Sequence, residues 1–282
     1  MSRSRPDTVS VVAGEGITLP GDYHVHTTWS DGTGSVEECV LRAAELGLAE
    51  IAITDHITPK PGSGEVWWVP LERLAAYVED VRGVAVRHPE IRVLLGLEAE
   101  YVAGQEAELD RLLDAWPFEL VVLGVHVVEG FEFDDPGLRG DPRWGDPDAL
   151  LAAYYRTMRR AAEYGRLDIL AHFDYISLWG HEPGAAALPE IDAALDALAA
   201  SGAALELNTD RISDPAGVMY PSVAIMSAAR ERGVPLVIDS DAHEAAHVGR
   251  LLDEAIAYAR AAGYRETLRL SDRTLVPLPL HG

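Results

Sequence analysis

The stretch Asp22 to Gly32, DYHVHTTWSDG, places two histidines one residue apart at the expected end of a β-strand. Alternate residues of a strand point the same way, so His24 and His26 can face one side of a sheet and chelate one metal ion. An isolated pair of this kind also arises without function, from one solvated and one half-buried histidine. The positions of the other histidines therefore decide between the two interpretations.

Short β-branched runs alternate with longer amphipathic stretches along the rest of the chain, which predicts repeated β-α units and a parallel sheet. The helical stretches have recognisable ends. Ser35 and Glu38 are spaced as a capping box, Asp146 is a capping acid before Pro147, and glycines such as Gly165 follow the last turns. Seven strands are expected, at residues 21–26, 50–55, 91–101, 119–126, 168–173, 203–208 and 235–241.

Seven β-α units in series predict an α/β fold with a nearly closed barrel, in which the chemistry gathers at the carboxyl ends of the strands. The length suits one large domain over residues 1–282, with an N-terminal extension at 1–20 and a tail at 267–282 that adds a short strand. Two long loops, 57–70 and 129–146, are expected to wall or cover the site.

Composition excludes several classes of partner. Acidic residues outnumber basic ones 46 to 23, for a formal charge of −23. No broad surface can then neutralise the phosphates of nucleic acid, although carboxylates that ligate metal ions contribute to such an excess. The single cysteine, Cys39, cannot form an internal disulfide and is expected to be buried. With no apolar signal core and no apolar run of about 18 residues, we expect a cytoplasmic protein that binds no membrane.

Histidines and acids gather at the expected strand ends. These positions make up roughly a tenth of the chain, so about one of the ten histidines would fall there by chance. Nine imidazole and carboxylate ligands are more than one zinc-like ion takes, which indicates two or three ions bound close together. The residues concerned are His24, His26, His56, His126, His172 and His243, together with Asp31, Glu98 and Asp241.

The motifs around these residues resemble those of the polymerase and histidinol phosphatase (PHP) superfamily of metal-dependent phosphoesterases. The resemblance runs from about residue 22 to 264, and residues 205–243 resemble the monofunctional histidinol-phosphate phosphatase branch in particular. Six motifs carry it, in this order: HVHTTWSDG (24–32), ITDH (53–56), GLEAEY (96–101), GVH (124–126), AHFD (171–174) and SDAH (240–243).

The resemblance implies a distorted seven-stranded, TIM-like barrel with two or three zinc, manganese or iron ions. It also implies that a hydroxide bridging two ions attacks the phosphorus, with Glu98 as a bridging ligand and Asp241 or His243 helping to protonate the departing alkoxide. The implied ligand sets are His24, His26, Glu98 and Asp241 for one ion, Glu98, His126 and His172 for a second, and Asp31, His56 and His243 for a third.

The expected basic residues of this branch are missing. An arginine is expected a few residues after Asn208, where Ser213 and Asp214 stand instead, and no lysine follows AHFD. Cations in loops are more often solvated than functional, and tryptophans more often pack than bind substrate. The candidates for substrate contact are the cations Lys60, Arg139, Arg143 and Arg211 and the tryptophans Trp67, Trp68 and Trp179.

Three functions remain open at this point. The first is a phosphomonoesterase on a small metabolite, with L-histidinol phosphate, an intermediate of histidine biosynthesis, as the favoured substrate. The second is a metalloenzyme on the same scaffold that acts on a small organic molecule without a phosphate, including aromatic ones, and the missing basic residues count for it. The third is a non-catalytic barrel that keeps its metals, which the intact ligand set disfavours.

Overall fold

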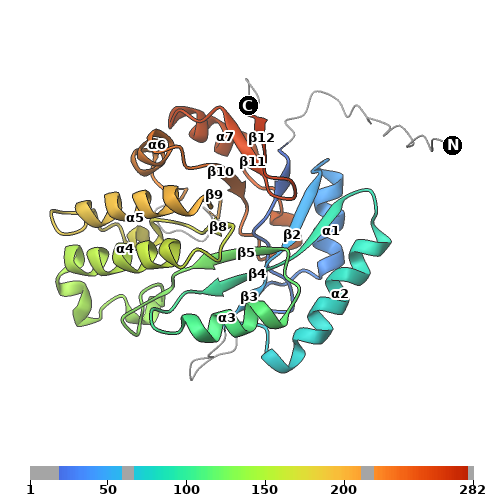
Figure 1. The fold of residues 1–282 in the computed structure, drawn as a ribbon, viewed down its shortest axis with the longest axis horizontal. Coiled ribbons are helices and arrows are strands. Elements are labelled where there is room, and N and C mark those ends of the chain that lie inside the picture. The colour runs from blue at the N-terminus through green and yellow to red at the C-terminus, as the bar shows by residue number, and fades with distance from the viewer. Residues whose placement is uncertain (1–18, 59–66, 211–218, 279–282) are drawn as a thin grey trace.

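The computed structural model describes residues 19–58, 67–210 and 219–278. Over these residues a parallel sheet curves into a nearly closed barrel with helices on its outside (Figure 1). The spatial order β1-β2-β4-β5-β8-β9-β10 follows the chain, as repeated β-α units require, and confirms the seven predicted strands. They are β1 (Gly21–Asp22), β2 (Glu50–Ile53), β4 (Arg92–Glu100), β5 (Leu120–Gly124), β8 (Ile169–Leu170), β9 (Ala204–Asn208) and β10 (Leu236–Asp239), and a short β3 (His56–Ile57) pairs with β4.

The first and last barrel strands meet through residues that follow them. Val25 forms a parallel bridge with Ala242, in which the Ala242 carbonyl accepts from His26 N at 2.9 Å. On its other side Val25 N donates to Thr54 Oγ1 at 2.9 Å, and Thr54 N donates to the Val25 carbonyl at 2.9 Å. The segment that carries the paired histidines is therefore held between both of its neighbours.

The helices begin and end where the local signals predict. Ser35 accepts a bond from Glu38 N and Glu38 accepts one from Ser35 N, which completes the capping box. Asp146 caps the longest helix, and Gly165 closes it at φ 76°. The helices are α1 (Val36–Glu45), α2 (Leu74–Arg87), α3 (Glu106–Ala115), α4 (Pro147–Tyr164), α5 (Leu188–Ser201), α6 (Val223–Glu231) and α7 (Leu252–Ala261).

Both faces of the barrel sheet are apolar, as in other parallel sheets covered by helices. One set of alternating side chains, such as Ile51 and Leu95, packs in the large core that includes the helices. The other set, which includes Ala52, Leu94 and Val122, forms a separate buried cluster. Because residues alternate along a strand, this second cluster fills the barrel interior below the strand ends.

The C-terminal segment closes the opposite end of the barrel. It forms an antiparallel pair, β11 (Glu266–Arg269) and β12 (Thr274–Pro277), so the predicted short strand is one of two. Thr267 Oγ1 donates to the Leu236 carbonyl at 3.0 Å, and Ser271 hydrogen-bonds Glu50, which also accepts from Tyr23 OH at 2.9 Å. Glu50 and Leu236 begin their strands, so this tail covers the amino ends and leaves the carboxyl ends open.

The long loop at 129–146 is built around short elements. Its start pairs β6 (Val127–Val128) with β7 (Phe131–Glu132), and two 3₁₀ turns follow at Pro136–Leu138 and Pro142–Gly145. The other long loop lies largely outside the described residues. Among the described helices none is long and apolar enough to cross a membrane, and Cys39 is a buried free thiol.

We predict that Thr54→Val lowers the free energy of unfolding by about 1–3 kcal/mol, because Val25 N then remains buried without an acceptor. The substitution keeps the shape of a side chain that has no exposed surface. Urea unfolding measures the change.

Thr157→Val is the matched control, since Thr157 Oγ1 only donates to the Ala153 carbonyl inside α4, at 3.0 Å. We expect it to change stability by less than about 0.5 kcal/mol. Equal losses in the two variants would show that the bond from Val25 N to Thr54 does not stabilise the segment that carries the paired histidines.

Candidate metal centre

All nine predicted metal ligands lie at the open end of the barrel. Each lies at, near or after the end of a strand or begins one, and the carboxyl ends of parallel strands meet at one end of such a barrel. The structure therefore brings together residues from the whole length of the chain. His24 and His26 follow β1, Asp31 lies in the next loop, His56 begins β3, Glu98 lies near the end of β4, His126 follows β5, His172 follows β8, and Asp241 and His243 follow β10.

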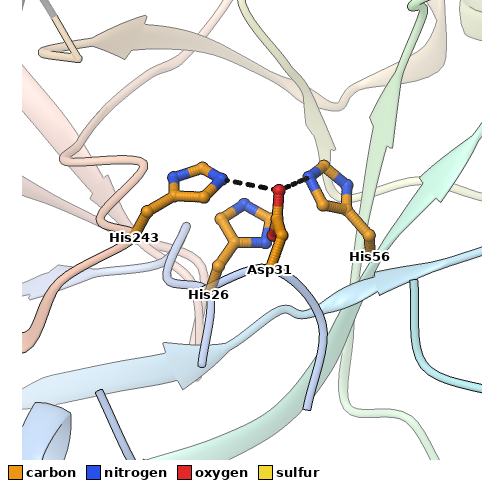
Figure 2. Close-up of side chains that lie close together, drawn as sticks. All are labelled: His26, Asp31, His56 and His243. Carbon is orange, nitrogen blue, oxygen red and sulfur yellow. Dashed lines mark ion pairs between the residues drawn. The ribbon is translucent and has the colours of Figure 1, made fainter. Parts of the chain in front are cut away.

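These residues form three groups whose ligand atoms all lie within 4.8 Å of one another. Figure 2 shows one of them, in which Asp31 Oδ2 lies 3.3 Å from His243 Nε2 and 3.8 Å from His56 Nε2. Each group has the mixed nitrogen and oxygen donors that suit zinc, manganese or iron. The groups are His26, Asp31, His56 and His243; His24, His26 and Asp241; and Glu98, His126 and His172.

Glu98 lies at the centre of this arrangement. Its two carboxylate oxygens have five imidazoles within 3.9 Å, and its side chain is buried. Its Oε2 lies 3.3 Å from His24 Nε2 and 3.6 Å from His26 Nε2, so Glu98 borders the second group as well as its own. A single carboxylate cannot satisfy five rings by hydrogen bonding alone.

Several buried atoms of this cluster make no well-oriented hydrogen bond among the described residues, even where a possible partner is near, as His56 Nδ1 is to Glu98 Oε2 at 2.7 Å. They are His24 Nε2, both ring nitrogens of His26, His172 Nδ1 and Glu98 Oε2. Orphaned buried polar atoms are costly, and native proteins rarely leave so many at one place. Divalent ions bound by these atoms would satisfy most of them, so the residues fit a cluster of metal ions.

The electrostatics give Glu98, Asp241 and His26 the protonation states that metal ligands need. Burial raises the pKa of Glu98, but the nearby imidazoles, chiefly His56 and His24, lower it well below its usual range. The Asp241 carboxyl behaves the same way, with burial opposed by His24 and a net pKa well below the usual range. Burial and the charges of His56 and His243 lower the pKa of His26 to about 3. The two acids are therefore anions and His26 is neutral near pH 7. At His24 and His126 burial lowers the pKa but nearby carboxylates raise it above the usual value, for His126 to about 10, so an ion bound there displaces a proton.

The backbone makes room for this crowding. The backbone φ angles of His172 and Asp241 are 28° and 48°, values that residues other than glycine rarely adopt. At Gly124 an added Cβ would lie 2.3 Å from Glu98 Oε1 and 2.9 Å from His126 Cε1. Glycine is needed there because the carboxylate occupies that space.

Three polar residues of the centre were not predicted from the sequence. Glu206 Oε1 lies 2.5 Å from His24 Nδ1, and Glu100 Oε2 lies 2.7 Å from His126 Nδ1. Asn208 Nδ2 donates to Asp241 Oδ2 at 2.9 Å. The sequence did contain a signal for these residues, which is a polar residue at every second position of an otherwise apolar buried strand, as in LELN at 205–208. Such alternation places the polar side chains on one face of the sheet.

A cavity of about 1180 Å³ opens beside the cluster. Trp67 and Trp68 line it, and Trp67 meets the His56 ring edge to face at 4.8 Å. The segment from Glu129 to Pro136 forms another part of the wall, as expected for one of the long loops. The described lining includes two arginines, Arg156 and Arg160 of α4, which the sequence did not single out.

Other predicted substrate contacts lie elsewhere. The guanidinium group of Arg139 lies over the Trp179 ring, with its Cζ 4.8 Å from the ring centre. Trp179 Nε1 donates a hydrogen bond to the Phe133 carbonyl. Arg143 pairs with Asp141 and covers the Phe131 ring. None of the three predicted residues lies among the described lining of the cavity. Lys60 and Arg211 lie outside the described residues.

Comparisons with known proteins show histidinol-phosphatases that are similar in sequence and in fold. The chain is 30% identical over 259 residues to a probable histidinol-phosphatase of Deinococcus radiodurans, covering 91% of this chain and 98% of that protein. It is 22% identical to the histidinol-phosphatase of Bacillus subtilis, over 81% and 95% of the two chains. The histidinol phosphate phosphatase of Lactococcus lactis, solved with zinc, L-histidinol and phosphate, superposes with a TM-score of 0.75 at 20% identity, over 92% of this chain and 99% of that one.

The solved structure confirms the distorted barrel fold, and the matches cover nearly all of both chains. The profile of the PHP domain matches residues 22–210, which includes seven of the nine clustered ligands. The chain belongs to the PHP domain family.

Proposed function

We propose that this protein is a metal-dependent phosphomonoesterase that hydrolyses L-histidinol phosphate, a step of histidine biosynthesis. The carrying observation is the buried Glu98 carboxylate, with five imidazoles within 3.9 Å and unsatisfied ring nitrogens around it. Its place at the open end of a barrel is where such folds carry out chemistry. The relatives from Deinococcus radiodurans and Bacillus subtilis support the choice of substrate.

The three groups of ligands suit three ions. The first would be held by His24, His26, Glu98 and Asp241, the second by Glu98, His126 and His172, and the third by Asp31, His56 and His243. Divalent ions there supply an activated nucleophile at neutral pH and neutralise the charge of a phosphoryl group.

Two ligand residues that line the cavity can also handle the leaving-group proton. Asp241 Oδ1 lies 3.7 Å from His243 Nδ1, and both side chains are partly exposed. Burial acts to lower the pKa of His243, but Asp31 and Asp241 raise it to about 9, so its ring holds a proton at neutral pH when no ion is bound. His243 is therefore placed to help protonate the departing alkoxide when its ring is not bound to an ion, whereas Asp241, an anion near pH 7, can only pass on a proton that it first accepts.

The charge of the cavity supports a substrate that carries a cation. Its described lining has nine carboxylates and two arginines. Among them Glu132, Asp134 and Asp135 come from the wall formed by the 129–146 loop. L-histidinol phosphate joins a phosphate to a primary amine, so the metal ions can take its anionic end while the acidic wall faces its cationic end.

We predict that the zinc- or manganese-loaded protein hydrolyses L-histidinol phosphate with kcat/KM of about 10⁴ M⁻¹s⁻¹ or more. His24→Ala should abolish this activity, because it removes a predicted ligand. His88→Ala should retain it, because His88 pairs with Glu37 on the outside of the barrel. Phosphate release in steady state measures all three proteins.

Negligible turnover by fully loaded protein would contradict the substrate assignment. The second candidate, a metalloenzyme acting on a molecule without phosphate, would then be tested with amine-bearing aromatic compounds. The edge-to-face contact between Trp67 and His56 beside the cluster is the observation that favours that candidate.

We predict that zinc stabilises the chelator-treated protein against unfolding. A free zinc concentration about 100 times the dissociation constant of one site should raise the free energy of unfolding by about 2.7 kcal/mol. Thermal or urea unfolding with and without zinc measures this. His88→Ala should respond like the wild type, and no stabilisation of either protein would contradict a metal centre.

We predict that Gly124→Ala lowers zinc affinity by about tenfold or more, because its methyl group would displace the Glu98 carboxylate. Gly140→Ala is the control, since a Cβ there meets nothing within 4 Å. Neither glycine has a positive φ, so the two variants differ in space and not in backbone strain. Equal zinc affinities in the two variants would show that Glu98 is not needed at its observed position.

A further inference from the structure

Glu206 is a carboxylate buried in the middle of β9, with no exposed surface. Its two oxygens have three polar neighbours. Oε1 lies 2.5 Å from His24 Nδ1, while Oε2 accepts from His172 N at 2.7 Å and from Asn208 Nδ2 at 3.2 Å. A charge in this position stays buried only because each oxygen is paired.

These neighbours lead to two different ligand groups. His24 belongs to the group with His26 and Asp241, whereas His172 belongs to the group with Glu98 and His126. Asn208 uses its amide nitrogen twice, since Nδ2 also donates to Asp241 Oδ2 at 2.9 Å. Glu206 thus reaches His24 and His172 directly, and Asp241 through Asn208.

Two of these ligands have unusual backbone conformations. His172 has φ 28° and Asp241 has φ 48°. Such conformations persist only where the surroundings hold them in several ways. The bond from His172 N to Glu206 and the contact of Asn208 with Asp241 are two such restraints.

Glu100 provides a contrast within the same barrel. Its carboxylate accepts from His126 N at 2.9 Å and from Val127 N at 3.0 Å, and it lies 2.7 Å from His126 Nδ1. Of the proposed ligands it therefore contacts His126, which belongs to one group only.

We infer that Glu206 is a positioning residue that sets two metal groups at once, and that the first and second ions depend on it together. A carboxylate behind a ligating imidazole fixes its tautomer and orientation, and losing such a partner commonly weakens metal binding ten- to a hundredfold. At Glu206 the same loss would act on ligands from β1, β8 and β10. The inference rests on the proposed function, because it assumes that the groups bind metal ions.

Glu206→Gln tests this with little change in shape. In either orientation the amide NH₂ faces a group that needs an acceptor, on the His24 side or on the His172 and Asn208 side. Zinc bound per chain is measured by equilibrium dialysis at buffered free zinc, and affinities are measured by competition with a chelating indicator. In Glu206→Gln we expect the zinc affinity of two sites to fall ten- to a hundredfold. In Glu100→Gln we expect the same fall at one site only.

Unfolding of the zinc-free variants, followed by circular dichroism, shows whether each is folded. If Glu206→Gln is not folded, Asn208→Ala replaces it. That variant removes the link from Glu206 to Asp241, and the acceptor of Asp210 N with it, but keeps the contacts of Glu206 with His24 and His172. We expect that variant to lower the zinc affinity of one site about tenfold. An unchanged zinc affinity would overturn the inference.

The outcomes separate the two proposals. Wild-type protein that binds no zinc would overturn the proposed function together with this inference. Wild-type protein that binds zinc, with Glu206→Gln weakening one ion or none, would overturn the inference alone. Weakening of two ions in Glu206→Gln and one in Glu100→Gln would support it.

Discussion

The structure depends on one constraint, which is that a buried carboxylate shares its surroundings with five imidazoles. Glu98 and its neighbours leave polar atoms unsatisfied at one end of a barrel that also holds a buried apolar cluster. An arrangement of this kind is costly unless cations occupy it. The glycine at position 124 and the positive φ values of His172 and Asp241 are local features that make the crowding possible.

A second layer of carboxylates supports the ligands. Glu206 and Glu100 contact histidines of the proposed metal centre, whereas Asp55 bonds the loop that carries Asp31. Asp55 accepts from Thr27 N at 2.7 Å and from Ser30 Oγ at 2.6 Å, which shapes the loop that leads to Asp31. Part of the excess negative charge of the chain therefore lies on carboxylates around the proposed metal centre, where bound cations would neutralise it.

The two ends of the barrel differ, since one is closed by packing and the other is open at the proposed metal centre. The amino ends are closed by the C-terminal strand pair, with Glu50 bonded to Tyr23 and Ser271. The carboxyl ends remain open to a cavity with an acidic wall and two tryptophans. In folds of this kind the loops at the carboxyl ends of the strands determine which substrate binds, while the strands position the residues of the reaction centre.

Much of the fold and of the cluster could be predicted from local patterns. The strand positions follow from β-branched runs, and the capping box at Ser35 and the closing Gly165 follow from local turn chemistry. The spacing of His24 and His26 and the rule that parallel strands end together indicated that nine distant ligands would meet. These features depend on short stretches of chain or on a regular repeat.

The tertiary structure alone decided which side chains face the cavity. Arg139 and Arg143 lie in a long loop but pack against Trp179 and Phe131, whereas Arg156 reaches the lining from α4. The contacts of Glu206 likewise arise only in the folded barrel, where β9 lies between β8 and β10 and His24, which follows β1, reaches the Glu206 carboxylate. The sequence by itself determined the strands and the ligand types, because period and spacing are local. Long-range packing decided the walls and the supporting carboxylates, because their partners lie far away along the chain.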